Sequence, residues 1–192
     1  YGVNTKIKRT LKYGDFDYMK IDLDFYINKK LGPFSIYTRH RLESIHGNDI
    51  PNQEELGIFN ISNFYLMGSQ TPGREYMSPR GYRGESRKGK NAYMGSVEFR
   101  APVLPLNIIE VLKVINFGRP TVALISDFAD AWTPGENHQK LIIQAGAEFR
   151  FSILLTTLPV LTFSYGWAQS IEDYRNNVIP NSYFQLTLIN PF

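Results

Sequence analysis

Long segments in which apolar and polar residues alternate dominate this sequence, and they constrain its fold more than any other feature. Between Asn91 and Val103, one set of alternate positions is apolar or small, while the other set carries Glu98 and Arg100. The same period of two sorts residues 19–27 and 141–153. Because side chains alternate between the two faces of a β-strand, this pattern predicts strands with one apolar face and one charged or small face.

Applied along the chain, the alternation predicts an all-β, antiparallel fold of about nine strands. The predicted strands span residues 3–12, 16–29, 34–46, 57–68, 91–103, 114–129, 140–153, 160–169 and 182–192. The apolar connection at residues 104–114 fits this scheme poorly and could include a short helix. No tandem repeat, low-complexity tract or linker divides the chain, which indicates a single domain over residues 1–192.

Strand length favours a transmembrane β-barrel over a soluble sheet. Most predicted spans exceed the roughly five or six residues of a typical soluble strand and match the roughly 9 to 11 that a tilted strand needs to cross a membrane. Alternation alone also fits a soluble or anchored lipid-binding β-barrel with its apolar face inward, which stays an alternative. Aromatic residues near strand ends, typical of interfacial girdles, favour the membrane: Trp132, Tyr165, Trp167, Tyr174 and Tyr183.

Composition narrows the classes of function. Lys and Arg number 21 against 18 Asp and Glu, so the net charge of +3 is slight and nucleic acid is not an expected partner. The absence of cysteine excludes disulfides, zinc thiolate sites and cysteine nucleophiles. The most apolar run, at residues 103–115, is too short for a transmembrane helix, which needs about 20 apolar residues. The start at Tyr1, without signal-peptide features, suggests a mature or truncated piece.

Catalytic residues are not indicated. His40 and His46 share a face of one predicted strand but lie roughly 20 Å apart along it, too far to bind one metal ion, and His138 falls in a predicted loop. No triad of nucleophile, base and orienting carboxylate is found. We therefore expect no enzyme activity, metal or cofactor. A barrel enzyme acting on lipid stays a rival, although the Ser and His pair that it needs on the outer wall has no strong candidate.

A glycine-rich basic stretch, SPRGYRGESRKGKN at residues 78–91, lies between two alternating segments. It lacks both the GxxxxGK[ST] spacing and the following helix of a Walker phosphate loop. Most of its charge, from Arg83 to Lys90, is expected at an exposed return of the loop that faces solvent or lipopolysaccharide.

The passage FYLMGSQ to SPRGYRG resembles a strand-to-loop motif, FxxGG followed by (V/I)RG(F/Y), of the BamA-type outer-membrane assembly factors, also called the bacterial surface antigen family. GSVEFRAPV, ALISDFADAW and the terminal YFQLTLINPF resemble the family's later strands in the same order, so that the resemblance covers residues 60–192. Ser69, Pro79 and Ala129 depart from the family's pattern, as does a last strand without glycine, and these departures suggest a divergent member.

The resemblance implies that the chain is the C-terminal portion of a barrel of about sixteen strands, lacking the N-terminal strands and the periplasmic POTRA domains. It implies that the loop with Arg80, Gly81 and Tyr82 folds into the lumen, where Arg80 contacts Glu98 and Asp127. Gly81 would permit a tight turn, and Tyr82 would wedge the loop against the wall. It also implies a lateral seam and C-terminal signal on the last strand, at Phe184, Leu186, Leu188 and Phe192.

The implied function is the assembly and insertion of other β-barrels in the bacterial outer membrane, or in its organellar equivalent. The implied partners are outer-membrane lipid and lipopolysaccharide, client outer-membrane proteins or a secreted substrate, and accessory lipoproteins. The main alternative within the superfamily is a two-partner-secretion pore or another protein-translocating pore.

Overall fold

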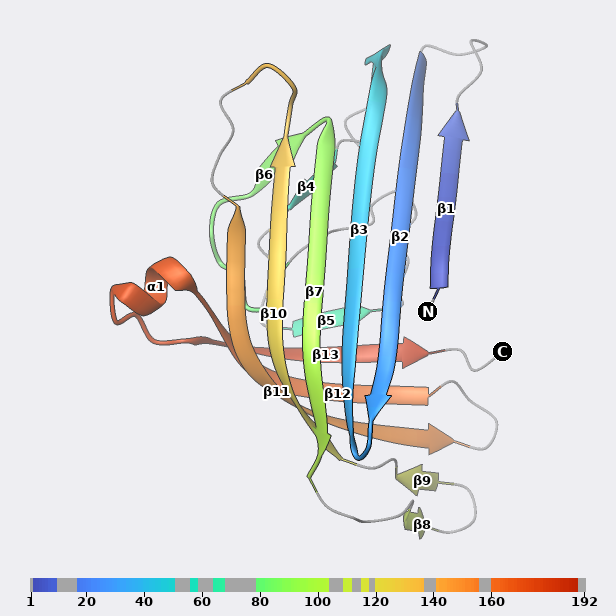
Figure 1. Ribbon diagram of the computed structural model, residues 1–192, viewed down its shortest axis with the longest axis vertical. Helices are drawn as coiled ribbons and strands as arrows, with labels where there is room; N and C mark the ends of the chain where they lie inside the picture. Colours follow the sequence, from blue (N-terminus) through green and yellow to red (C-terminus); the bar gives the residue numbers. More distant parts are fainter. Residues whose placement is uncertain are drawn as a thin grey trace.

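Long antiparallel strands form one curved, open sheet in the computed structural model of the chain (Figure 1). The structure describes residues 2–9, 17–50, 56–58, 64–67, 79–103, 109–111, 115–117, 120–136, 141–155 and 160–189. The predicted all-β, antiparallel class is confirmed, and the described sheet does not close into a barrel. Neighbouring strands follow the order β1 (Gly2–Arg9), β2 (Asp17–Leu31), β3 (Phe34–Asp49), β7 (Asn91–Pro102), β10 (Thr121–Trp132), β11 (Ile142–Leu155), β12 (Val160–Ser170) and β13 (Asn181–Ile189).

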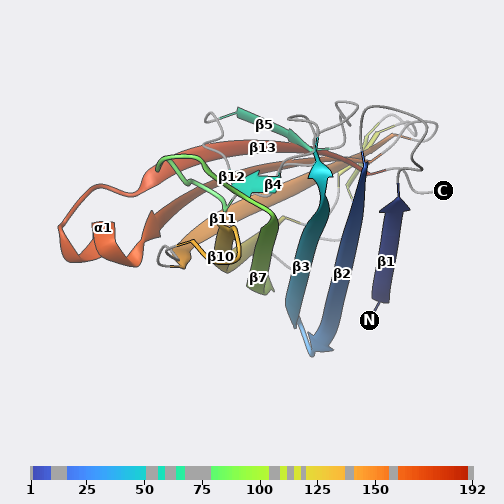
Figure 2. The same cartoon turned by 90° about the horizontal axis from the view of Figure 1, so that it is seen from above.

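Shorter elements complete the described part of the chain. A separate two-stranded sheet consists of β4 (Leu56–Ile58) and β6 (Arg87–Gly89), and β4 lies on the inner side of the curved sheet (Figure 2). β5 (Phe64–Met67) pairs with β13, and β8 (Ile109–Val111) pairs with β9 (Ile115–Phe117), which also pairs with β11. The helix α1 (Ile171–Arg175) joins β12 to β13. Within the residues described, no helix has the length and apolar character needed to cross a membrane.

Several predicted elements differ from the structure. The predicted strand at 57–68 is wrong, because β4 belongs to the small sheet and β5 to the edge of β13, so that β3 pairs directly with β7. The predicted strand at 114–129 is two strands, β9 and β10, separated at Pro120, which has no backbone N–H for the ladder. The short helix considered at 104–114 is absent from the described residues there, which form β8. α1 was not predicted; its first turn is capped by Ser170 Oγ, which accepts a hydrogen bond from Asp173 N at 2.9 Å.

The two faces of the sheet carry opposite chemistry. On the inner face, which the loop at residues 79–86 covers, Glu98, Asp127 and Glu148 are at most 5% exposed. On the outer face, Leu124 is 59% and Trp167 48% exposed. The distribution is the reverse of a soluble sheet, which buries its apolar face and turns its charged face to water.

Small side chains on the inner face make room for the elements that lie against it. Ala92 on β7, and Ala129 and Ala131 on β10, are buried and leave space above the sheet. Leu56 and Ile58 of β4 fill part of that space. The resulting apolar cluster also holds the loop residue Tyr82, and its remaining members are Tyr18, Ile45 and Ile142.

Candidate functional site

The turn at residues 79–82 brings Arg80 to the inner face. Tyr82 N donates a hydrogen bond to Pro79 O at 3.2 Å, and Gly81 between them has φ of +70°, as the third position of a type II turn requires. A Cβ on Gly81 would lie 2.9 Å from Ala168 Cβ of β12. Gly81 is therefore needed both for its backbone conformation and for the close approach of the loop to the sheet.

Two further contacts fix the turn. Asn181 Nδ2, on the first residue of β13, donates to Gly81 O at 3.1 Å. The buried ring of Tyr82 lies over Gly84, and its hydroxyl donates to Glu85 O at 2.7 Å. The resemblance implied that Tyr82 wedges its loop against the strands; in the structure Tyr82 packs in one apolar cluster with Leu56 and Ile58 of β4.

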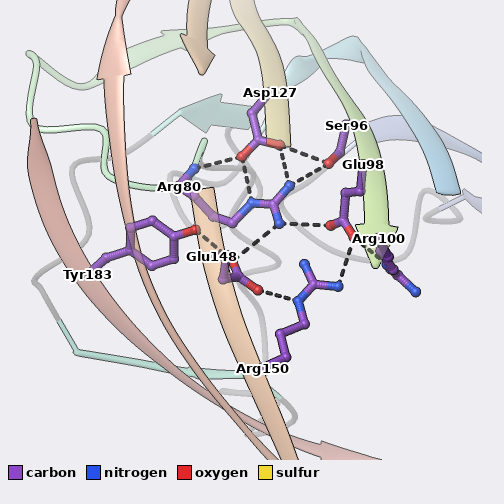
Figure 3. Close-up of polar contacts among 8 residues, drawn as sticks. All are labelled: Arg80, Ser96, Glu98, Arg100, Asp127, Glu148, Arg150 and Tyr183. Carbon is purple, nitrogen blue, oxygen red and sulfur yellow. Dashed lines mark hydrogen bonds and ion pairs between the residues drawn. The ribbon is translucent and has the colours of Figure 1, made fainter. Parts of the chain in front are cut away.

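Every N–H group of the Arg80 guanidinium has an acceptor within reach (Figure 3). Nε and Nη2 donate to the two carboxylate oxygens of Asp127 at 2.8 and 2.6 Å, the bidentate geometry that arginine is suited to. Nη1 donates to Glu98 Oε1 at 2.7 Å and lies 3.4 Å from Glu148 Oε2. Nη2 also donates to Ser96 Oγ at 2.7 Å. Arginine offers five N–H donors, so the set of contacts saturates this side chain.

Three neighbouring strands supply these acceptors because of their register. Ser96 and Glu98 lie on β7, Asp127 on β10 and Glu148 on β11. Asp127 is opposite Ser96 in the ladder, and Ser96 Oγ donates to Asp127 Oδ1 at 2.8 Å. The Arg80 backbone N–H also donates to Asp127 Oδ2, at 2.9 Å. Asp127, which is fully buried, thus accepts four hydrogen bonds.

A second group of side chains balances the remaining charge. Arg150 Nη1 and Arg100 Nε donate to Glu98 Oε2 at 2.8 and 2.7 Å, and Arg150 Nε also contacts Glu148 Oε1. Tyr183 OH donates to Glu148 Oε2 at 2.6 Å, and the Tyr183 ring lies over Gly166 of β12. Three arginines thus face three carboxylates, and their formal charges cancel. We call these six side chains the latch cluster: Arg80, Arg100, Arg150, Glu98, Asp127 and Glu148.

The carboxylates around Arg80, a loop residue, stabilise its protonated form. Burial by itself lowers the pKa of Arg80, but Asp127, followed by Glu98 and Glu148, raises that pKa well above its ordinary value. The Arg80 guanidinium, which attaches the loop to the sheet, therefore stays positively charged.

The structure brings together five of the residues that the sequence singled out, namely Arg80, Gly81, Tyr82, Glu98 and Asp127. The expected seam residues lie elsewhere. Phe184 and Leu186 are opposite Tyr165 and Phe163 on the outer face, and the Phe184 and Phe163 rings are 6.1 Å apart. Leu188 is opposite Leu161 in the backbone ladder. Phe192 lies outside the described residues.

Sequence reasoning missed Ser96, Arg100, Glu148, Arg150 and Tyr183. A repeated tripeptide could have revealed most of them: Glu-Phe-Arg occurs at 98–100 and again at 148–150, on β7 and β11. In each copy the acid and the arginine are two residues apart and so share the inner face. Nothing in the sequence indicated that β10 would bring the two copies to either side of one arginine.

The basic return of the loop is partly different from the expectation. Arg83, Lys88 and Lys90 are exposed, as predicted. Arg87, in contrast, is half-buried in β6, and its Nη1 lies 3.5 Å from Oδ1 of the buried Asp130. The expectation of a wholly exposed return is wrong at Arg87, because β6 pairs with β4 above the sheet.

A serine and a histidine do meet on the outer face, although the sequence offered no strong candidate. Ser44 Oγ lies 2.8 Å from His46 Nε2, and Ser44 donates its proton to Asn91 Oδ1 at 2.7 Å. His46 therefore donates to Ser44, whereas a general base would have to accept the serine proton. His40 is paired with Tyr93 and Thr38, at 2.9 Å each. His138 lies outside the described residues.

The side chains around Arg80 form an ionic anchor between one loop and the sheet. Across the described ranges, no group of three or more His, Cys, Asp or Glu side chains could hold a metal ion. What the latch cluster does is bind one loop to three strands through a saturated guanidinium. No model of a known protein family matches this chain, and no curated protein matches it either.

Proposed function

We propose that this chain is the C-terminal part of an outer-membrane β-barrel that assembles and inserts other barrel proteins, with the Arg80 loop as its lumenal lid. The observation that carries the proposal is the latch cluster. One loop arginine reaches Glu98 and Asp127, the two acids that the resemblance to the BamA-type family implies, and only 13% of its side chain is exposed.

The reversed polarity of the sheet supports a membrane setting. Large apolar side chains on the outer face, such as Phe149 at 44% and Leu124 at 59% exposed, suit contact with lipid. Charged side chains on the inner face suit a polar lumen, where Arg39 pairs with Asp24 and Arg41 with Asp22. A soluble lipid-binding barrel would have its apolar face inward, so this polarity speaks against that alternative.

Strand length supports the same setting. β7 and β10 each have 12 residues and β11 has 14, against the roughly 9 to 11 that a tilted strand needs to cross a bilayer. The described sheet ends at β1 on one side and, on the other, at β13 with the four-residue β5 beside it. Strand edges pair readily with further strands. In the proposed function, the work is done by backbone pairing at an edge and needs no nucleotide or metal.

The latch cluster would contribute by keeping the wall in one shape. It joins β7, β10 and β11 through one side chain, and Gly81 of the same turn is bonded to β13. A buried charge that loses its partner destabilises the protein. The loop therefore cannot move away from the three strands unless the strands also rearrange. Such a device suits a barrel whose last strands have to stay in place while its edge is open.

The experiment is a complementation of the full-length protein with Arg80→Ala, and with Arg83→Ala as the matched control from the exposed part of the same loop. We expect the Arg80→Ala protein to reach the membrane while the amounts of many folded outer-membrane proteins fall, and the Arg83→Ala strain to behave as wild type. Loss of one exported protein only would indicate the secretion pore instead. Normal levels of all outer-membrane proteins in the Arg80→Ala strain would refute the proposal.

A further inference from the structure

The connection from β12 to β13, which we call the α1 loop (residues 171–180), exposes large apolar side chains. Ile179 is 84% and Tyr174 74% exposed, the two highest values among the large apolar side chains that the structure describes. Ile171 and Val178 of the same loop are exposed as well. A group of exposed apolar side chains on one short segment marks an interaction surface.

Hydrogen bonds at both ends of α1 hold the backbone of the α1 loop. At the start, Ser170 Oγ accepts a hydrogen bond from Asp173 N at 2.9 Å. At the end, Asn177 has a φ of +54°, and its N–H donates to Tyr174 O at 3.2 Å. Val178 N donates to Asp173 O at 3.0 Å, which completes a Schellman motif. The apolar side chains are therefore presented by a capped, hydrogen-bonded backbone.

The α1 loop adjoins the apolar outer face of β12. Gln169 Nε2 donates to Val178 O, and Gln169 lies two residues after Trp167, so that both share the outer face. Trp167 packs edge to face against Tyr165, with the ring centroids 4.8 Å apart. In Figures 1 and 2, α1 extends past the ends of β11 and β12, on the side away from β4. Since β4 lies on the inner side, the α1 loop prolongs the outer surface beyond the end of β12.

A lipid bilayer suits the α1 loop better than a protein partner does. Its four exposed apolar side chains are few compared with the roughly 20 to 30 residues on each side of a stable protein interface. At the ends of membrane-crossing strands, aromatic side chains typically lie where the acyl chains meet the headgroups. Ile171 and Tyr174 are three residues apart and so share one side of α1, beside the charged Glu172 and Arg175. Apolar and charged side chains on one short helix are typical of a segment that lies in this interface.

We propose that the α1 loop is a membrane anchor, whose Tyr174, Val178 and Ile179 insert among the lipids of the nearer leaflet. The partner is lipid, at the depth where the acyl chains meet the headgroups. The inference rests on the membrane setting of the proposed function and adds a contact beyond the ends of the strands. Asn181 directly follows the loop and donates to Gly81 O at 3.1 Å. An anchored α1 loop therefore also fixes the end of the strand that holds the Arg80 turn.

The first test measures the depth of the loop. The chain contains no cysteine, so Ile179→Cys can carry one environment-sensitive fluorophore in the full-length protein, with any cysteine outside residues 1–192 replaced. The protein is reconstituted in phosphatidylcholine vesicles with a spin label on the acyl chains close to the headgroup. The spin label quenches a fluorophore in the bilayer, and iodide quenches one in water. Leu124→Cys on the outer face and Glu136→Cys in the exposed turn after β10 are the two controls.

We expect the lipid spin label to quench the Ile179 fluorophore as it does the Leu124 fluorophore, and iodide to quench it several-fold less than the Glu136 fluorophore. Iodide access equal to that at Glu136, with lipid quenching at Leu124, would overturn the anchor. Protection from iodide without lipid quenching would mean that protein covers the loop, and would overturn it too.

The second test changes the anchor itself. In a protein labelled at Tyr174→Cys, Ile179→Asp should lower lipid quenching of the label several-fold, because a carboxylate has to leave the acyl chains. Glu172→Gln is the control and should leave the quenching as it is. The exposure of Ile179 makes a folding defect an unlikely source of the change, and equal elution in detergent by size-exclusion chromatography checks this. Quenching that Ile179→Asp leaves unchanged would refute the anchor.

The two proposals fail separately. Absence of lipid quenching at Leu124 as well as at Ile179 would refute the membrane setting and both proposals with it. Lipid quenching at Ile179 together with normal client levels in Arg80→Ala would support the anchor and refute the proposed function.

Discussion

Replacing Arg80 by alanine should open the loop without unfolding the sheet. The change removes two of the four hydrogen bonds to Asp127 and leaves Glu98, Asp127 and Glu148 facing only Arg100 and Arg150. Asp127 has no exposed surface, so its charge cannot be compensated by water without movement. Removing one partner of a buried ion pair costs about 3 to 5 kcal/mol. That cost would raise the population of the open loop roughly a hundredfold to a few thousandfold.

The assay is limited tryptic cleavage of the full-length protein in membranes or detergent, followed through cuts after Arg83 and Lys88. The cleavage rate in Arg80→Ala should rise in proportion to the open population when opening and closing are fast. Arg80→Lys should lie between the two, because an ammonium group keeps the charge but not the planar five-donor geometry.

A double mutant separates charge from contact. Arg80→Ala combined with Asp127→Asn removes the uncompensated carboxylate. The free-energy cost of the double mutant, taken from its cleavage rate, should therefore be smaller than the sum of the costs of the two single mutants. Fully additive effects, or a cleavage rate in Arg80→Ala equal to that of wild type, would show that the guanidinium does not hold the loop.

The other predictions concern the turn, the inner face and the outer face. Gly81→Ala should destabilise the folded protein in urea by more than Gly135→Ala, because both glycines have positive φ but only at Gly81 would the new methyl group meet other atoms, at 2.9 Å. Tyr183→Phe should cost about 1 to 3 kcal/mol by leaving Glu148 short of a donor; Tyr165→Phe, on the exposed outer face, is the control and should cost nothing measurable. Leu124→Arg should reduce membrane insertion by about 2 to 4 kcal/mol if the outer face meets lipid near the midplane, and wild-type insertion would contradict that assignment.

Most long strands could be predicted from the sequence because period two is a local property. The alternation at 19–27, 91–103 and 141–153 assigns each residue to the face on which the structure places it. It could not give the partners of short apolar segments. Residues 56–58 and 64–67 satisfy the same pattern as a long strand, yet they pair with β6 and β13. Pairing of four residues is decided by which edge is available in three dimensions, and periodicity carries no such information.

The candidate site was predictable to the extent that it depended on motifs. The contact of Arg80 with Glu98 and Asp127 was implied by the resemblance to the BamA-type family, while the alternation by itself placed only the two acids on the polar face. The repeated Glu-Phe-Arg could have pointed to Glu148, but the positions of Glu148 and Tyr183 beside Arg80 are set by the register of strands that follow later in the sequence. A site built from four strands is specified by their relative shifts, and a one-residue slip would turn any of these side chains to the opposite face.

Among the described residues, three tyrosines each cover a glycine two residues away or on the adjacent strand: Tyr82 over Gly84, Tyr93 over Gly95, and Tyr183 over Gly166. At each glycine an added Cβ would come within 2.7 Å of the tyrosine hydroxyl. Each tyrosine also has a hydroxyl partner, in turn Glu85 O, His40 Nδ1 and Glu148 Oε2. Tyrosine and glycine therefore form one packing unit at these places: a side chain added at the glycine would displace the ring, and the loss of the ring would uncover the backbone of the glycine. In a set of descendants of this chain, both members of a pair should be kept or exchanged together.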